Sequence, residues 1–191
     1  MKDFELEPVP PQVRPPRFRD HVHEHVVEID RPWSVAWSWL HDPDTFIKGQ
    51  PWPYRVEFLD TPRPDGAVAS GFDVGTRNAH HGPFLNFCGV ITRVVVEEGR
   101  AERDLRYDYG AYALGFRLIR PTLLRIGVVG LGPDRCRVTV RVEFHVRGWM
   151  SGTWILAQRC FRPFFSVIFP TVMSPLNDLN DWTITSHFNC F

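Results

Sequence analysis

The sequence predicts an α+β fold in which a curved antiparallel β-sheet wraps around a long C-terminal α-helix. Three observations predict it. Strand-like runs separated by turn signals fill the middle of the chain, an apolar pattern with helical spacing follows them, and only short helical segments lie near the start. A domain of 191 residues can bury enough apolar surface to fold without disulfides or a metal ion.

The N-terminal part predicts an arm, a strand and two short helices. Residues 1–19 are rich in proline, which favours an extended arm, so we divide the chain into this arm and one domain over residues 20–191. Residues 21–30 alternate as a strand does. Pro32 suits the start of a helix, and a second short helical turn runs through Phe46. The apolar positions of the first helix are Trp33, Ala36, Trp37 and Leu40.

The middle of the chain predicts about six antiparallel strands. The run over residues 135–147 is the cleanest, because its valines and Phe144 alternate with charged and polar residues, as in a sheet with one face on a core and one in water. A turn at residues 62–66 and another at 132–134 separate strands. The other predicted strands cover residues 54–59, 72–77, 84–98, 105–113 and 123–131.

The C-terminal part predicts the long helix. Ser151 is a candidate N-cap, and apolar residues recur downstream at about 3.6-residue spacing. Pro163 and Pro170 must kink or interrupt this helix, because proline lacks the backbone N–H that the helix needs. The apolar positions are Trp154, Ala157, Phe161, Phe165, Ile168 and Val172.

Composition argues against several classes of function. The 22 basic residues balance the 22 acidic ones, so the chain lacks the basic excess of nucleic-acid binders, and we expect no nucleic-acid partner. Four widely spaced cysteines indicate reduced thiols, and no metal or cofactor motif is present. The N-terminus lacks the apolar core of a signal peptide, and the longest uncharged apolar run is too short to span a membrane, so we expect a cytoplasmic protein.

Histidines mark the first predicted strand. His21, His23 and His25 share one face with Val27 and Ile29. We expect solvated or hydrogen-bonded side chains at the strand end, with zinc binding and proton transfer as alternatives. One metal cannot be bound by all three, because strand positions i and i+4 are about 13 Å apart.

Tyrosines and arginines of the predicted strands each have two possible roles. Tyr107, Tyr109 and Tyr112 either pack at the rim of the sheet or place hydroxyl groups in a cavity. Arg77 and Arg117 either form surface salt bridges, which we favour, or pair with a carboxylate or enolate of a ligand.

The order of elements and three segments resemble those of the START-like, or SRPBCC, superfamily. The opening HVHEHVVEIDRPWSVAWSWLHDPDTFIKG is similar to that family's strand, acid-x-Pro break and Trp-containing helix. GVITRVVVEEGRAERDLRYDYG is similar to its paired middle strands, and RCRVTVRVEFHV to its last strand. The resemblance covers about residues 20–175 and is closest to the polyketide cyclase/dehydratase-like and lipid-transfer branches. It implies a helix-grip fold, although the family's last helix is often uninterrupted by proline.

The resemblance implies an apolar small-molecule ligand between the sheet and the C-terminal helix, such as a lipid, a polyketide or an isoprenoid. A single helix over a strongly curved sheet also leaves apolar space at its widest point. No cofactor is expected. The residues expected to line the cavity are Trp37, Phe87, Tyr107, Tyr109, Phe144, Trp154, Phe161 and Phe165.

Two other functions stay open at this point. The first is a cyclase/dehydratase-like enzyme in which a histidine, tyrosine or arginine of the pocket polarises a carbonyl group, although no nucleophile elbow, phosphate loop or metalloprotease motif is present. The second is an interaction protein that docks on a partner, or transiently on a membrane, through its apolar C-terminal segment. Residues 163–176 could act there as a lid or a membrane-touching edge.

Overall fold

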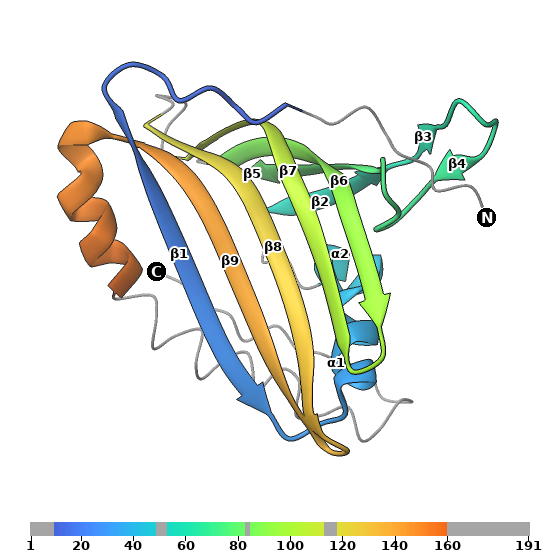
Figure 1. Cartoon of the computed structure of the whole chain (residues 1–191). Helices are drawn as coiled ribbons and strands as arrows, with labels where there is room; N and C mark the ends of the chain where they lie inside the picture. The colour runs from blue at the N-terminus through green and yellow to red at the C-terminus, as the bar shows by residue number, and fades with distance from the viewer. Residues whose placement is uncertain (1–9, 49–52, 83–84, 113–117, 160–191) are drawn as a thin grey trace.

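The computed structural model describes residues 10–48, 53–82, 85–112 and 118–159, and its largest feature is a seven-stranded antiparallel sheet (Figure 1). The strand order is β1-β9-β8-β7-β6-β5-β2, and β3 and β4 form a separate two-stranded hairpin. The strands are β1 (Phe18–Ile29), β2 (Arg55–Leu59), β3 (Thr61–Pro62), β4 (Val68–Ala69), β5 (Arg77–Gly82), β6 (Leu85–Glu97), β7 (Arg100–Tyr112), β8 (Ile119–Gly132) and β9 (Arg135–Arg147).

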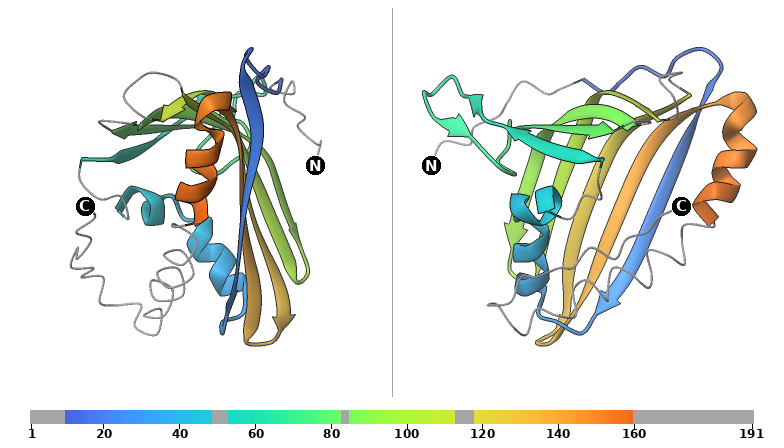
Figure 2. Two further views of the ribbon diagram at one scale, coloured as in Figure 1. Left: turned by 90° about the vertical axis from the view of Figure 1, so that its left-hand side faces the viewer. Right: turned by 180° about the vertical axis from the view of Figure 1, so that it is seen from behind.

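Helices lie on one face of this sheet. They are α1 (Trp33–Leu40), α2 (Pro43–Lys48), the 3₁₀ turn η1 (Gly148–Met150) and the helix that begins at residue 151 and is described to residue 159. Figure 2 shows α1, α2 and the C-terminal helix on the same side of the sheet, with α1 and the C-terminal helix toward different parts of it. We call this side the concave face. The predicted α+β helix-grip class is therefore confirmed, with a large antiparallel sheet and a C-terminal helix.

Side chains alternate between the two faces of each strand. On β9, Val138, Phe144 and Val146 are buried on the concave side, whereas Arg137 and Arg141 form ion pairs on the other. Concave-face residues form three clusters of buried apolar side chains. One lies under α1 around Trp37 and Val128, a second surrounds Phe87 and Ile91, and a third contains Phe144 beside Trp154.

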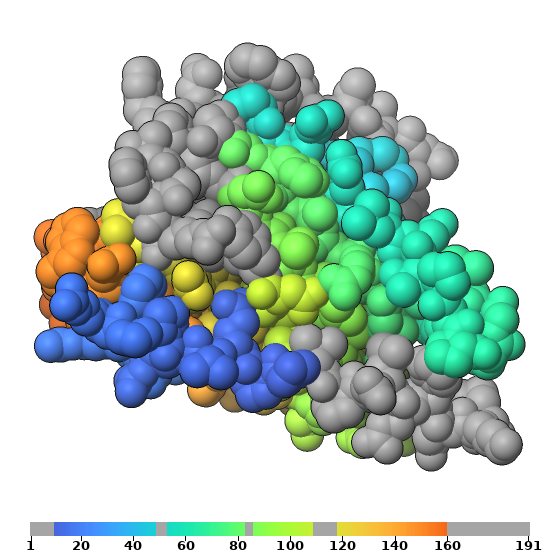
Figure 3. All heavy atoms as spheres, turned by 90° about the horizontal axis from the view of Figure 1, so that it is seen from above, coloured from blue at the N-terminus to red at the C-terminus, as the bar shows by residue number. Residues whose placement is uncertain are grey.

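The proline-rich arm is attached to the end of the sheet. The side-chain amide of Gln12 donates hydrogen bonds to the backbone oxygens of Tyr107 and Pro121, at 2.5 and 3.0 Å. The β7–β8 register is interrupted here, between Arg106 and Tyr112, and Pro121 has no N–H to donate across the gap. Figure 3 shows the described part of the arm, in blue, lying along this end of the molecule. Gln12 therefore fixes the described part of the arm to the sheet.

Most predicted elements are confirmed, and two are wrong. The strand expected over residues 72–77 is a turn, because Gly71 and Gly75 have φ of 57° and 100°, and β5 begins only at Arg77. Ser151 is not an N-cap: its φ and ψ of −55° and −41° are helical, and η1 runs directly into the helix. The predicted course of the helix beyond residue 159, including its proline kinks, lies outside the described residues.

Candidate functional site

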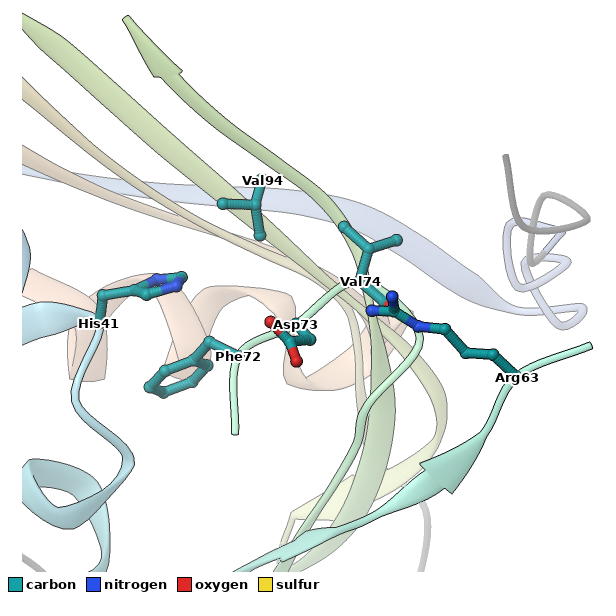
Figure 4. Close-up of a pocket in the computed structure, with 6 residues that line it drawn as sticks. All are labelled: His41, Arg63, Phe72, Asp73, Val74 and Val94. Carbon is teal, nitrogen blue, oxygen red and sulfur yellow. The ribbon is translucent and has the colours of Figure 1, made fainter. Parts of the chain in front are cut away.

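A pocket of about 280 Å³ opens on the concave side, where the end of α1, the β3–β4 hairpin, the turn before β5 and strand β6 meet (Figure 4). Small-molecule pockets usually measure roughly 300–1,000 Å³, so this one suits a small molecule or part of a larger one. Its lining combines three apolar and three ionisable side chains: His41, Arg63, Phe72, Asp73, Val74 and Val94.

The turn over residues 70–76 supplies half of this lining. Asp73 stabilises it in two ways, since its carboxylate accepts a hydrogen bond from the Ser70 backbone N–H and its own backbone N–H donates to the Ser70 oxygen. Gly75 donates from its backbone to the oxygen of Ile91 and fixes the turn to β6. Phe72 is thereby buried, whereas the Asp73 side chain stays exposed at the pocket.

His41 forms the wall on the α1 side. It caps α1, with its backbone N–H bonded to the Trp37 oxygen, and its ring stacks on the Trp37 ring at 4.8 Å between centroids. Burial and the nearby Arg103 guanidinium lower the pKa of His41, and Asp73 opposes them only in part. The imidazole is therefore neutral at physiological pH.

Arg103 lies behind this wall on the concave face of β7. It is only 3% exposed, its Nη1 donates to the Leu40 backbone oxygen at 2.9 Å, and its guanidinium lies 3.4 Å from the Phe72 ring centroid. No carboxylate of the described residues comes within 4.0 Å of it. Burial lowers the pKa of Arg103 to about 9, so the group is still protonated near neutral pH.

Arg63 reaches the pocket from the opposite side to His41 (Figure 4). Its Nη2 donates to the backbone oxygen of Val74 at 3.0 Å, which ties the hairpin to the turn. The pocket therefore offers a neutral imidazole, a carboxylate and a guanidinium around the apolar side chains of Phe72, Val74 and Val94. Such a site can hold a molecule with an apolar body and a small number of polar groups.

The predicted lining residues are distributed among the three clusters rather than brought to this pocket. Trp37 packs under α1 and contacts His41, while Phe87 and Tyr107 meet edge to face at 5.0 Å in the cluster that also contains Phe72. Phe144 and Trp154 meet edge to face at 5.3 Å in the third cluster. The Tyr109 side chain and residues Phe161 and Phe165 lie outside the described part of the chain.

The histidine row of β1 faces the interior rather than water. His21, His23 and His25 are opposite Phe144, Val142 and Val140 of β9, which belong to the concave face. His21 Nε2 and the Ser151 hydroxyl are 3.1 Å apart, as expected for a hydrogen-bonded histidine. His25, however, is 6% exposed, so a solvated side chain is the wrong interpretation there.

Of the two arginine candidates, one lies within the described residues. Arg77 forms the expected surface ion pair, with Asp108 at 2.5 Å, whereas Arg117 and the side chain of Tyr112 lie outside them. No three His, Cys, Asp or Glu side chains of that part of the chain gather as metal ligands. No helix within it is long and apolar enough to cross a membrane.

Sequence reasoning missed the ionisable residues of the pocket. His41, Arg63 and Asp73 each belong to a turn or an element end, where no periodic pattern indicates direction. One signal was available. Arg103 alternates in register with Ala101 and Leu105, so an arginine occupies the apolar face of a strand.

Comparison with known proteins identifies structures with a similar fold but no match in sequence. No family model matches the chain, and no curated protein is similar to it in sequence. A norcoclaurine synthase point mutant from Thalictrum flavum, in complex with a transition-state analogue, superposes with a TM-score of 0.51 at 16% identity, covering 84% of this chain and 98% of that one. A protein from Arthrobacter aurescens gives 0.54 at 15% identity, covering 89% and 92%.

A START superfamily protein from Mycobacterium smegmatis is also similar, with a TM-score of 0.48 at 14% identity, covering 82% of this chain and 99% of that one. The chain shares the fold of the first two structures, in agreement with the START-like fold that the sequence resemblance predicted. At these identities the similarity extends to the fold alone.

Proposed function

We propose that this protein binds a hydrophobic small molecule on the concave side of its sheet and that the pocket beside His41 holds the polar end of that molecule. The observation that carries the proposal is the combination of Phe72, Val74 and Val94 with three ionisable side chains in one pocket. Apolar surfaces supply affinity at about 25 cal/mol per Å² buried, and a few polar groups fix orientation.

The predicted lining residues support a larger site behind the pocket. Phe72 belongs to the pocket and also to the cluster that contains Phe87 and Tyr107. A ligand that displaced some of these contacts would extend along the concave face toward Phe144 and Trp154. The full set of eight residues stays a prediction, and so does the class of ligand, whether lipid, polyketide or isoprenoid.

A second candidate is a cyclase/dehydratase-like enzyme. The observation that favours it is that the neutral imidazole of His41 and the carboxylate of Asp73 line one pocket and interact electrostatically. Such a pair can transfer a proton to or from a ligand. A protein with the same fold, norcoclaurine synthase, is an enzyme by name.

Transient membrane contact and a cytoplasmic location are further expectations from the sequence.

The experiment compares two substitutions on the same strand. Val94→Phe fills the pocket, while Val96→Phe places the same ring at a position that is 58% exposed. Purified wild-type protein and both variants are incubated with 1-anilinonaphthalene-8-sulfonate, a fluorescent probe of apolar sites, and native mass spectrometry records any co-purified molecule. We expect Val94→Phe to lose the probe and the co-purified mass and Val96→Phe to retain both. Equal binding by all three proteins would exclude this pocket.

A further inference from the structure

The contact between Arg103 and His41 determines which ring nitrogen carries the hydrogen. Nη1 of Arg103 is 3.5 Å from Nδ1 of His41. A guanidinium group has donors only, so Nδ1 must be the acceptor in this contact. A neutral imidazole that accepts at Nδ1 holds its hydrogen on Nε2.

The resulting Nε2–H donor is available to a ligand. Among the described residues nothing accepts a hydrogen bond from it, and His41 is part of the pocket wall. The ring is also held in place, because it stacks on Trp37 and lies 5.4 Å from the Phe72 ring. A donor with a fixed direction discriminates between ligands more sharply than one on a freely rotating side chain.

We propose that Arg103 is a positioning residue that presents His41 to the pocket as a fixed hydrogen-bond donor, and that the pocket consequently selects ligands with an oxygen acceptor on an apolar body. Carbonyl, carboxylate and phenolate oxygens share this chemistry. The inference rests on the proposed function, since it takes the pocket as the ligand site.

The charges around His41 favour such an acceptor. Arg103 approaches from β7 and Arg63 lies across the pocket on the β3–β4 hairpin, while Asp73, from the turn before β5, is the one carboxylate of the lining. Two guanidinium groups against one carboxylate leave a positive balance, which attracts oxygen atoms with full or partial negative charge.

A purely structural role explains Arg103 less well. Burying a guanidinium without a carboxylate is costly, and one hydrogen bond to Leu40 and the Phe72 ring offset only part of that cost. A methionine or leucine would fill the same place on an apolar strand face more cheaply. The presence of a charged guanidinium at this buried position is explained if its charge and its hydrogen-bond donors act on His41.

The first test needs no ligand. In the full chain labelled with ¹⁵N, NMR reads the tautomer and the pKa of His41. We expect the Nε2–H tautomer in the wild type, and Arg103→Met should raise the pKa of His41, because a cation that opposes protonation is removed. Arg103→Gln retains a donor for Leu40 and should raise it similarly. Arg100→Met, an exposed position on the same strand, is the matched control and should leave it unchanged. An Nδ1–H tautomer in the wild type would overturn the proposal even if no variant folds.

The second test uses two probes of similar size. Acetophenone carries a carbonyl oxygen and ethylbenzene does not. NMR titration of the wild type should give about fivefold tighter binding of acetophenone, as one net hydrogen bond predicts, and Arg103→Met should remove that preference. Equal affinities in the wild type would overturn the ligand class while leaving the pocket as a binding site. The pocket itself is tested separately by the same titration of Val94→Phe, which should lose binding of both probes.

Discussion

Two arginines on neighbouring strands show how differently the two faces of this sheet treat charge. Arg125, on the convex face, donates from Nε and Nη2 to the two oxygens of Asp104 at 2.7 Å each, and these bonds raise its pKa. Arg103, on the concave face of β7, has no carboxylate within 4.0 Å among the described residues, and burial lowers its pKa. Asp104 is its immediate neighbour in the chain but belongs to the other face.

This difference separates a structural arginine from one that acts on a site. The convex-face arginine completes a two-point ion pair, which is the arrangement that stabilises such a charge. The concave-face arginine has no comparable partner and instead contacts His41 and Phe72, two residues of the pocket. Four experiments test this contrast.

The largest effect is expected at the convex pair. Arg125→Met removes the partner of Asp104, whose side chain is only 9% exposed, and leaves a nearly buried carboxylate without a cation. We expect a loss of about 2 kcal/mol in the free energy of unfolding, measured by urea denaturation, since the pair is partly open to solvent. Adding Asp104→Leu should restore most of it. An unchanged midpoint for the single variant would contradict the structural role.

Acid should destabilise the protein through concave-face histidines. Burial lowers the pKa of His80, which stacks on Phe87 at 4.2 Å, from 6.5 to about 4. Between these two pKa values the unfolded chain binds a proton at His80 and the folded protein does not. The contribution of neutral His80 to stability is therefore present above pH 6.5 and is lost as the pH falls toward about 4. We expect a loss of about 1 kcal/mol between pH 6.5 and about 5.5 from this residue.

The matched variant for the pH experiment is His80→Phe, which retains a ring against Phe87. Carboxylates contribute with the same sign at lower pH, so the informative quantity is the difference between wild type and variant in urea unfolding at each pH. The variant should show a flatter profile between pH 6.5 and about 5.5. Parallel profiles would mean that His80 is protonated in the folded protein.

The sequence predicted the frame of the molecule far better than its pocket. Residues 135–147 form a strand with the predicted bounds, and α1 follows Pro32, because alternation, helical spacing and proline chemistry are local signals. The turn over residues 70–76 depends on two glycines with positive φ and on a backbone contact to Ile91, which no local pattern reveals. The pocket is built by such contacts, so its residues could not be read in advance.

A smaller effect is expected from Arg103→Met. The substitution removes a hydrogen bond to Leu40 but also removes a buried charge, and the two contributions oppose each other. We expect a change within about 1 kcal/mol in urea unfolding, in either direction. Leu105→Ala, a buried neighbour on the same face, is the control that must destabilise, by about 2 kcal/mol or more. A comparable loss for Arg103→Met would make Arg103 structural, like Arg125.

The smallest effect concerns salt. Glu102 on the convex face contacts Arg93, Arg100 and Arg125, and the first two arginines are about half exposed. Glu102→Gln should cost about 0.5 kcal/mol at low ionic strength and almost nothing in about 1 M NaCl, where charges are screened within about 3 Å. The pKa of His41, lowered by burial and then by the Arg103 guanidinium, should change little between the same two buffers, because Arg103 is buried and shielded from salt. Two results together would contradict this contrast. They are a rise in the pKa of His41 at high salt and a cost of Glu102→Gln that is the same at low and high salt. The concave contact would then be open to salt and the convex ion pairs protected from it.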